Sequence, residues 1–193
     1  MAYQTYTTRA LVCGSWSSNS ADKTFLLYTQ TLGMIHATAR SVREERSRQR
    51  YALQDLAEIK VSLVRGRAGW RIGSVIDIDQ PFRNATDRAA RGSVVYIYRM
   101  LRRFVSGSET SPEVYGLVTE ALQYLVRSDV SDRAVIQDCV CFRLLHHLGY
   151  IAPTPAQRPA LDLPVAELSP TLSPAVLHSL REAIAQAETV SHL

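Results

Sequence analysis

The sequence is poor in cysteine and has no long apolar segment. Its three cysteines, Cys13, Cys139 and Cys141, are an odd number without a framework spacing, so a disulfide-stapled secreted fold is not expected. No apolar run approaches the roughly 18 residues of a membrane span, and the first residues lack the basic and apolar regions of a signal peptide. We therefore expect a soluble cytoplasmic protein that does not enter a membrane.

Signatures of catalysis and of metal binding are also missing. The chain has no Gly-rich phosphate-binding loop and neither a G-x-S-x-G nor an H-E-x-x-H motif, so we do not expect an enzyme. Cys139, Cys141, His146 and His147 are close in sequence, but the two cysteines would point about 200° apart on one helix. We therefore expect Cys139 to be a core residue, and we expect no metal and no cofactor.

Positive charge is concentrated in the first half of the chain. Residues 1–103 hold seventeen Arg and Lys against eight acids, a net charge of +9, whereas residues 104–193 hold five Arg against ten acids, a net charge of −5. Such an excess of positive charge is typical of a protein that binds a polyanion, and nucleic acid is the commonest polyanion in the cytoplasm. A surface that is merely soluble is the alternative.

The first 80 residues read as short strands, because apolar residues recur at every second position between turn signals. In the clearest segment, Ala57, Ile59, Val61 and Leu63 share one face. Closure into a barrel hides the edges of five short strands, so we predict an OB-fold over residues 1–80. The five predicted strands are Arg9–Trp16, Lys23–Thr29, Met34–Arg40, Ala57–Leu63 and Trp70–Ile78.

After Asp79-Gln80-Pro81 the apolar period becomes that of helices, which predicts an α+β protein with an all-α domain over residues 81–150. Six prolines between Ile151 and Pro174 predict an extended connector, and the stripe of Leu177, Leu180 and Ile184 predicts a last short helix. We expect residues 151–193 to pack on the helical domain. The three predicted helices before the connector are Ser93–Val105, a helix that begins at Pro112, and one from Ser131 to Leu148.

An arginine-rich segment joins the third and fourth predicted strands. Arginines in such a loop can neutralise phosphates and stack on unpaired bases; the alternative is a solvated loop in which they pair with Glu44 and Glu45. Four aromatic residues of this half, Trp16, Tyr28, Tyr51 and Trp70, could stack on bases or be buried, and the sequence leaves this open. The candidate nucleic-acid-binding residues are Lys23, Arg40, Arg43, Arg46, Arg48, Arg50, Arg65, Arg67 and Arg71.

Three stretches together resemble the bacterial RecO family of recombination mediators. They are the run from Ser20-Ala21-Asp22-Lys23 through Thr31-Leu32-Gly33-Met34-Ile35 to Ser47-Arg48, the turn Leu63-Val64-Arg65-Gly66-Arg67, and the helix end Phe142-Arg143-Leu144-Leu145-His146-His147-Leu148-Gly149-Tyr150 with Pro153. The resemblance covers about residues 8 to 155, in order and at the family's spacing. The chain departs from many relatives because a proline-rich stretch without cysteines replaces their four-cysteine zinc module, so it resembles a short form of the family.

The resemblance implies an OB-fold followed by a helical domain, and a nucleoid-associated protein that binds and anneals single-stranded DNA. With RecR, such a protein helps to load RecA onto strands coated by single-strand-binding protein. It implies DNA contact at Lys23 and the arginines of the 40–50 segment, with Arg65 and Arg67 as weaker candidates. The helical domain of the family receives the acidic tail of single-strand-binding protein, for which Arg99, Arg102 and Arg103 are our candidates; a helix face that only supports the barrel is the alternative.

Two other functions remain open from the sequence. A generic OB-fold binder of RNA or DNA would bind nucleic acid but would ignore RecR and the tail of single-strand-binding protein. A protein-binding adaptor would show no salt-sensitive affinity for oligonucleotides.

Overall fold

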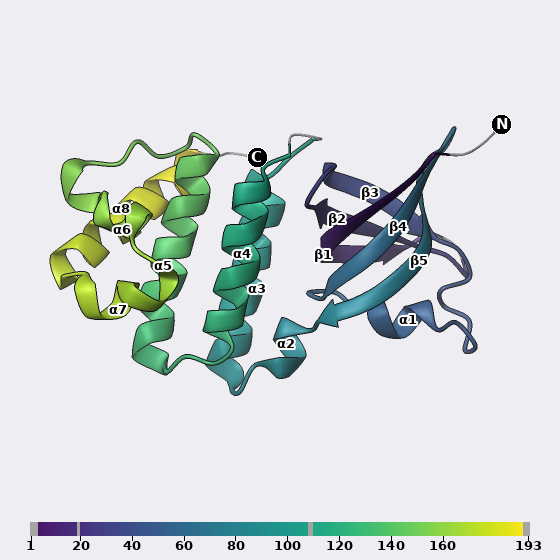
Figure 1. The fold of residues 1–193 in the computed structure, drawn as a ribbon, viewed down its shortest axis with the longest axis horizontal. Coiled ribbons are helices and arrows are strands. Elements are labelled where there is room, and N and C mark those ends of the chain that lie inside the picture. Colours follow the sequence, from purple (N-terminus) through teal and green to yellow (C-terminus); the bar gives the residue numbers. More distant parts are fainter. Residues whose placement is uncertain (1–3, 19, 108–109, 191–193) are drawn as a thin grey trace. The chain divides into compact units, whose positions relative to one another are not determined.

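The computed structural model describes residues 4–18, 20–107 and 110–190, which form two compact units (Figure 1). The barrel unit contains the described residues up to Phe82 together with Ser106–Pro112, and the helical unit contains Arg83–Val105 and the described residues from Glu113 onward. None of the helices in this described part of the chain is long and apolar enough to cross a membrane.

Five strands close the barrel of the first unit. They are β1 (Thr5–Ser17), β2 (Lys23–Thr29), β3 (Gly33–Ala39), β4 (Glu58–Gly66) and β5 (Gly69–Asp79), and a short helix, α1 (Gln49–Ala52), lies between β3 and β4. The strand order is β1-β2-β3-β5-β4; β1 pairs with β4 in antiparallel fashion, and a short parallel pairing of β3 with β5 completes the closure. The predicted α+β protein with a five-stranded OB-type barrel is therefore confirmed.

The period-two pattern of the strands produces the core of the barrel. On β4, Ile59, Val61 and Leu63 are completely buried, whereas Lys60 is exposed. Burial of an aliphatic side chain contributes about 1.5–3 kcal/mol, so this alternation fixes which face of the strand points inward. The same inward set includes Ala10, Val12, Phe25, Leu27, Ile35, Ala37, Ala39 and Ile72.

Glu58 departs from the expected alternation. It belongs to the face that the sequence predicts to be wet, yet only 3% of the residue is exposed, and its carboxylate lies 2.8 Å from Nη2 of Arg9. One positive charge of the barrel is therefore neutralised within the fold.

The barrel unit is assembled from two separate stretches of the chain. Beyond the helix that follows the barrel, the chain returns to it at Ser106–Pro112. The backbone N–H of Met34 donates to the carbonyl of Gly107 at 2.9 Å, and the Tyr28 hydroxyl donates to the carbonyl of Ser111 at 3.4 Å. Burial raises the pKa of Tyr28 to about 12, with a smaller contribution from Cys13, so the hydroxyl stays protonated and can donate at neutral pH.

The helical unit is built around α5 (Val130–His147), which packs against α3 (Arg88–Phe104), α6 (Pro159–Asp162), α7 (Leu168–Thr171) and α8 (Pro174–Val190) (Figure 1). The remaining helices are α2 (Pro81–Asn84) and α4 (Pro112–Leu125), with 3-10 turns at Pro155–Gln157 and Val165–Glu167. The apolar residues of α5 that are buried are Ile136, Cys139, Val140, Cys141, Phe142, Leu144 and Leu145.

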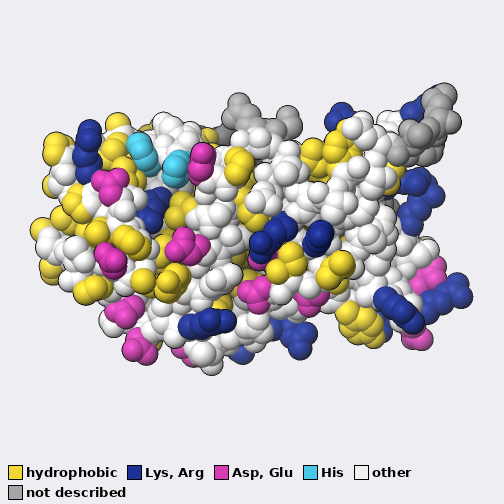
Figure 2. Space-filling view, viewed as in Figure 1, with side chains coloured by type: hydrophobic (Ala, Val, Ile, Leu, Met, Phe, Trp, Pro, Cys, Tyr) yellow, Lys and Arg dark blue, Asp and Glu magenta, His cyan; other side chains and the backbone are white. Residues whose placement is uncertain are grey.

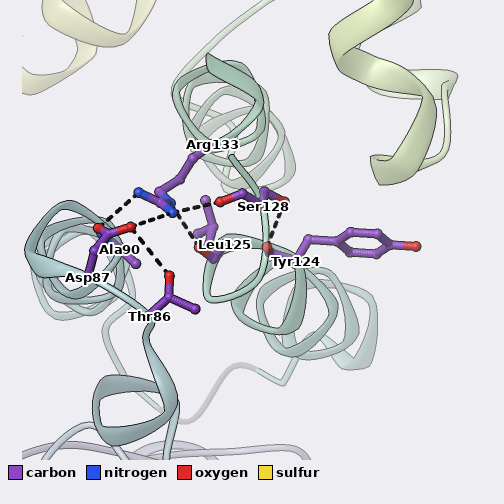
Figure 3. Close-up of polar contacts among 7 residues, drawn as sticks. All are labelled: Thr86, Asp87, Ala90, Tyr124, Leu125, Ser128 and Arg133. Carbon is purple, nitrogen blue, oxygen red and sulfur yellow. Dashed lines mark hydrogen bonds and ion pairs between the residues drawn. The ribbon is translucent and has the colours of Figure 1, made fainter. Parts of the chain in front are cut away.

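A buried arginine connects the ends of three helices (Figure 3). Arg133 of α5 donates to both carboxylate oxygens of Asp87, at 3.2 and 3.1 Å, and to the carbonyls of Leu125 at 3.1 Å and Ser128 at 2.6 Å. Asp87 also caps α3 by accepting from the Ala90 N–H at 2.8 Å. This single guanidinium therefore fixes the start of α3, the end of α4 and the first turns of α5 relative to one another.

Three predictions about the helical half are corrected. Helix α3 begins at Arg88 rather than at Ser93, because Asp87 caps it and its first turns, which are mostly exposed, show no apolar period. The proline-rich stretch is not extended. Pro155 and Pro159 are the first residues of short helical turns, a position at which the backbone N–H that proline lacks would have no partner within the helix. The last helix, α8, is not short, since it spans 17 residues.

Candidate nucleic-acid interface

The arginine-rich segment between β3 and α1 is fastened to the barrel. Val42 is buried in the barrel core, and the Arg43 N–H donates to the carbonyl of Ala21 at 3.1 Å. The Ser41 N–H donates to the carboxylate of Asp22 at 2.8 Å. Because one apolar side chain is anchored inside and two backbone N–H groups are bonded, the segment is held against the barrel and its charged side chains lie at the surface.

One hollow, with a volume of about 390 Å³, lies between this segment and β5. Arg40, Arg46 and Arg71 line it together with Glu44. Arg46 is paired with Glu44 at 3.1 Å, whereas Arg40 and Arg71 are exposed and form no ion pair with any described residue. A hydrogen bond from Ser41, followed by the contact with Arg46, lowers the pKa of Glu44. The hollow therefore carries three cations and one anion.

A second hollow, of about 560 Å³, lies where the same segment meets the ends of β1 and β2. Lys23, Arg43 and Arg50 line it with one acid, Asp55. The apolar residues Phe25, Val42 and Leu53 also contribute to its wall, and the Lys23 ammonium lies 5.6 Å from the Phe25 ring centroid. Six of the nine candidate residues are thus gathered in two neighbouring basic hollows.

The other three candidates lie outside the hollows. Arg48 precedes α1 and is exposed. Arg65 lies over the ring of Trp70, 5.1 Å from its centroid, and Arg67 is at the exposed β4–β5 turn. In Figure 2, Lys and Arg side chains gather over the barrel where α1 and its preceding loop lie, with acidic side chains among them.

The structure separates the four aromatic candidates. Tyr28 is buried, and Trp70 contacts the ring of Tyr6 as well as Arg65. Tyr51 is 65% exposed, but Arg50 lies against its ring and donates to its hydroxyl at 2.8 Å. Trp16 is 46% exposed, and its described ring partner is His36, in an edge contact at 5.2 Å. Sequence reasoning missed His36, because twenty residues separate it from Trp16.

The basic half of the sequence does not coincide with the barrel unit. Among the described residues of the barrel unit there are eleven Arg and Lys against seven acids, a net charge of +4. The remaining basic residues of the first 103 positions belong to the helical unit, where Arg83 lies on α2 and the other five lie on α3. The electrostatic signal of the barrel is therefore local: it comes from the two hollows rather than from the whole unit.

The candidate partner-binding arginines line a hollow of the helical unit with a volume of about 470 Å³. Arg99, Arg102 and Arg103 surround it, and the half-buried Tyr96 adds apolar surface. Glu188 of α8 is also in its wall and accepts from the Tyr96 hydroxyl at 3.3 Å, while Arg103 donates to the Glu188 carbonyl. The hollow thus combines positive charge with apolar surface, as the hypothesis of an acidic peptide requires.

The cysteines and histidines of α5 do not share a site. Cys139 and Cys141 are both completely buried, and burial raises the pKa of Cys139 to about 12 and that of Cys141 well above its usual value. The Nδ1–H of His146 donates to the carbonyl of Ile151, 3.0 Å away. Within residues 4–18, 20–107 and 110–190, no group of three or more His, Cys, Asp and Glu could hold a metal ion.

Comparison with known proteins adds no relative: no protein-family model matches the chain, and a search of curated proteins found no significant match. The resemblance to RecO therefore remains a prediction from the sequence stretches quoted above.

Proposed function

We propose that the protein is a non-enzymatic recombination mediator of the RecO type that binds and anneals single-stranded DNA in the cytoplasm, at the nucleoid. The supporting observation is the pair of basic hollows that the 40–57 segment forms with the barrel, which gather Lys23, Arg40, Arg43, Arg46, Arg50 and Arg71. Each hollow has an excess of two positive charges, enough to neutralise adjacent phosphates of one strand.

The shape of this surface favours a flexible strand. The first hollow lies between the segment and β5, and the second lies between the same segment and the ends of β1 and β2, so a ligand that contacts both must pass over or around the segment. A single strand can follow such a path at low energetic cost, whereas a duplex has a persistence length of about 150 bp. Small barrels of this topology commonly bind unpaired strands along a positively charged groove.

The hollow of Arg99, Arg102 and Arg103 supports the partner side of the proposal. An acidic peptide with an aromatic end needs cations beside apolar surface, and the half-buried ring of Tyr96 supplies apolar surface here. We propose that this hollow receives the tail of single-strand-binding protein, and that RecR and RecA act with the protein on the coated strand.

The test is a titration of fluorescent oligonucleotides, single-stranded and duplex, at several salt concentrations. Replacement of Arg40 and Arg71 by Gln removes two cations that form no ion pair. If each contacts a phosphate, the slope of log K against log salt should fall by about 1.4 for a single strand, at about 0.7 per contact. The matched control is the double replacement of Arg88 and Arg91 by Gln, two exposed arginines of α3, which should leave the slope unchanged.

Annealing of complementary strands and binding of the tail peptide complete the test. A folded protein that binds oligonucleotides but neither anneals them nor binds the peptide would be the generic OB-fold binder. One without any salt-sensitive affinity would be the adaptor. Loss of peptide binding in an Arg99→Gln/Arg102→Gln variant that still binds DNA would assign the two ligands to separate units.

A further inference from the structure

An exposed aromatic pair lies on the outer surface of the barrel, away from the core side chains. Trp16 stands at the end of β1 and His36 in the middle of β3, and their rings meet edge to face at 5.2 Å. Nearly half of Trp16 is exposed. An exposed indole presents a large, flat apolar face on which another aromatic ring can stack.

Strand register places Trp16 at one end of a continuous row across four strands, and His36 lies in the neighbouring row, where it pairs with Leu26. Trp16 pairs with Thr24, Thr24 with Thr38, and Thr38 with Arg71. The inward neighbours Phe25 and Ala37 are buried in the core, so the row belongs to the outer face of the sheet. The row therefore runs from an exposed indole to an exposed arginine that also lines the first basic hollow.

The side chains between the two ends of the row are short. The hydroxyls of Thr24 and Thr38 lie 3.2 Å apart, and Thr24 also pairs with Ser18 at 2.5 Å. Because these hydroxyls satisfy one another, they form a low, flat floor beside the tall indole. A planar ring can approach the indole over that floor without a clash, while a phosphate of the same strand reaches Arg71.

We infer that Trp16, with His36 as the side chain that holds its edge, is a base-stacking platform that makes this protein select unpaired nucleotides. The inference rests on the proposed nucleic-acid binding and adds how bases, rather than phosphates alone, contribute to it. An unpaired base offers a free aromatic face, and stacking tolerates any base. The bases of a duplex are already stacked on one another, so the platform discriminates against duplex. His36 is a positioning residue in this arrangement.

The experiment compares two single strands of equal charge, oligothymidylate and an abasic oligomer of the same length. Trp16→Ala and Trp16→Leu should each weaken binding of oligothymidylate about tenfold, leave binding of the abasic oligomer unchanged, and leave the salt slope unchanged. Trp16→Phe, which keeps an aromatic face, should retain most of the affinity. Tyr124→Ala is the matched control, because Tyr124 is a partly exposed aromatic residue on α4 of the helical unit; it should change neither affinity.

Tryptophan fluorescence gives a second readout. The chain contains two tryptophans, so in Trp16→Phe the emission comes from Trp70 alone. Oligothymidylate should quench the wild-type protein, and the quenching should disappear in Trp16→Phe even though the oligomer still binds.

The two levels of the proposal fail in different ways. If wild-type protein binds neither oligomer in a salt-dependent manner, the proposed nucleic-acid function is wrong. If it binds both oligomers equally well, and Trp16→Ala and Trp16→Leu bind oligothymidylate as the wild type does, phosphate binding stands and the platform is refuted. An equal loss for both oligomers in folded Trp16→Ala would likewise refute stacking and assign Trp16 a role in shaping the surface.

Discussion

Replacing Arg133 by Met should destabilise the helical unit by about 2–4 kcal/mol. The substitution keeps an unbranched apolar stem but removes every donor. The carbonyl of Leu125 loses a partner in a buried position, and that of Ser128 loses one in a half-buried position. An acceptor left unsatisfied in the interior costs about 1–3 kcal/mol. The side chain of Asp87 is 45% exposed and regains water, so it adds nothing to this figure.

The assay is urea denaturation of the whole protein, followed by far-ultraviolet circular dichroism, with the transition of the helical unit compared between variants at equal slope. Arg181→Met is the matched control. Arg181 pairs with Asp138 at 2.6 Å, but its side chain is 54% exposed, so its loss should cost about 1 kcal/mol or less. A change below about 0.5 kcal/mol for Arg133→Met would refute the reasoning, because it would mean that the two carbonyls find other donors.

The same pair predicts the direction of a pH effect. A hydrogen bond from the Ala90 N–H, followed by Arg133, lowers the pKa of Asp87 below its ordinary value of 3.8. The native state therefore binds this proton less readily than the unfolded chain, so the contribution is fully present above pH 3.8 and is lost as the pH falls through the lower native value. The free energy of unfolding of the wild type should therefore fall in that range by more than that of Asp87→Asn, whose side chain does not titrate; equal declines down to pH 2 would contradict it.

Two further predictions concern the backbone and the thiols. Gly69→Ala should destabilise the protein by about 1–2 kcal/mol, because Gly69 has a φ of +106°. Gly92→Ala on the exposed face of α3 should instead stabilise it by about 0.5–1 kcal/mol, because alanine favours the helix. Thermal denaturation measures both variants, and equal shifts of the melting temperature would contradict the argument. All three cysteines are buried and the pKa of Cys139 is raised to about 12, so none should react with a disulfide reagent at pH 8 until the protein is unfolded; rapid native labelling would contradict this.

The barrel could be predicted because its strands carry their information locally. On β4, the alternation of Ile59, Val61 and Leu63 with polar residues predicts both that the segment is a strand and which of its faces points into the core. The turn residues between strands then leave few ways to pair the segments. Closure follows because a five-stranded sheet with free edges would expose unpaired backbone groups.

The proline-rich region could not be predicted in this way. Proline is forbidden inside a helix but favoured at its first turn, so the same residue indicates either a break or a start. A helical element begins at each of Pro155, Pro159 and Pro174. What decides between the two meanings is the tertiary packing of residues such as Ala160 and Leu168, which are completely buried, and a single sequence does not contain that information.

The residues of the candidate site could be predicted only in part from the sequence, for a similar reason. Arginines that are neighbours in sequence, such as Arg40, Arg43 and Arg46, could be identified from the 40–50 segment alone. Their division into two hollows depends on Val42, whose side chain turns inward between them. The addition of Arg71 to one hollow, and of His36 to Trp16, depends on strand register, which brings together residues that are twenty or more positions apart.

The return of the chain to the barrel at Ser106–Pro112 has a consequence for biosynthesis. The backbone N–H of Met34 and the hydroxyl of Tyr28 donate to carbonyls that lie more than seventy positions later in the chain. A nascent chain that has emerged only as far as β5 already holds the five described strands of the barrel, yet it still lacks the carbonyl acceptors of Gly107 and Ser111. The barrel unit should therefore complete its folding only after α3 and residues 106–112 have been synthesised, although these five strands are translated before α3.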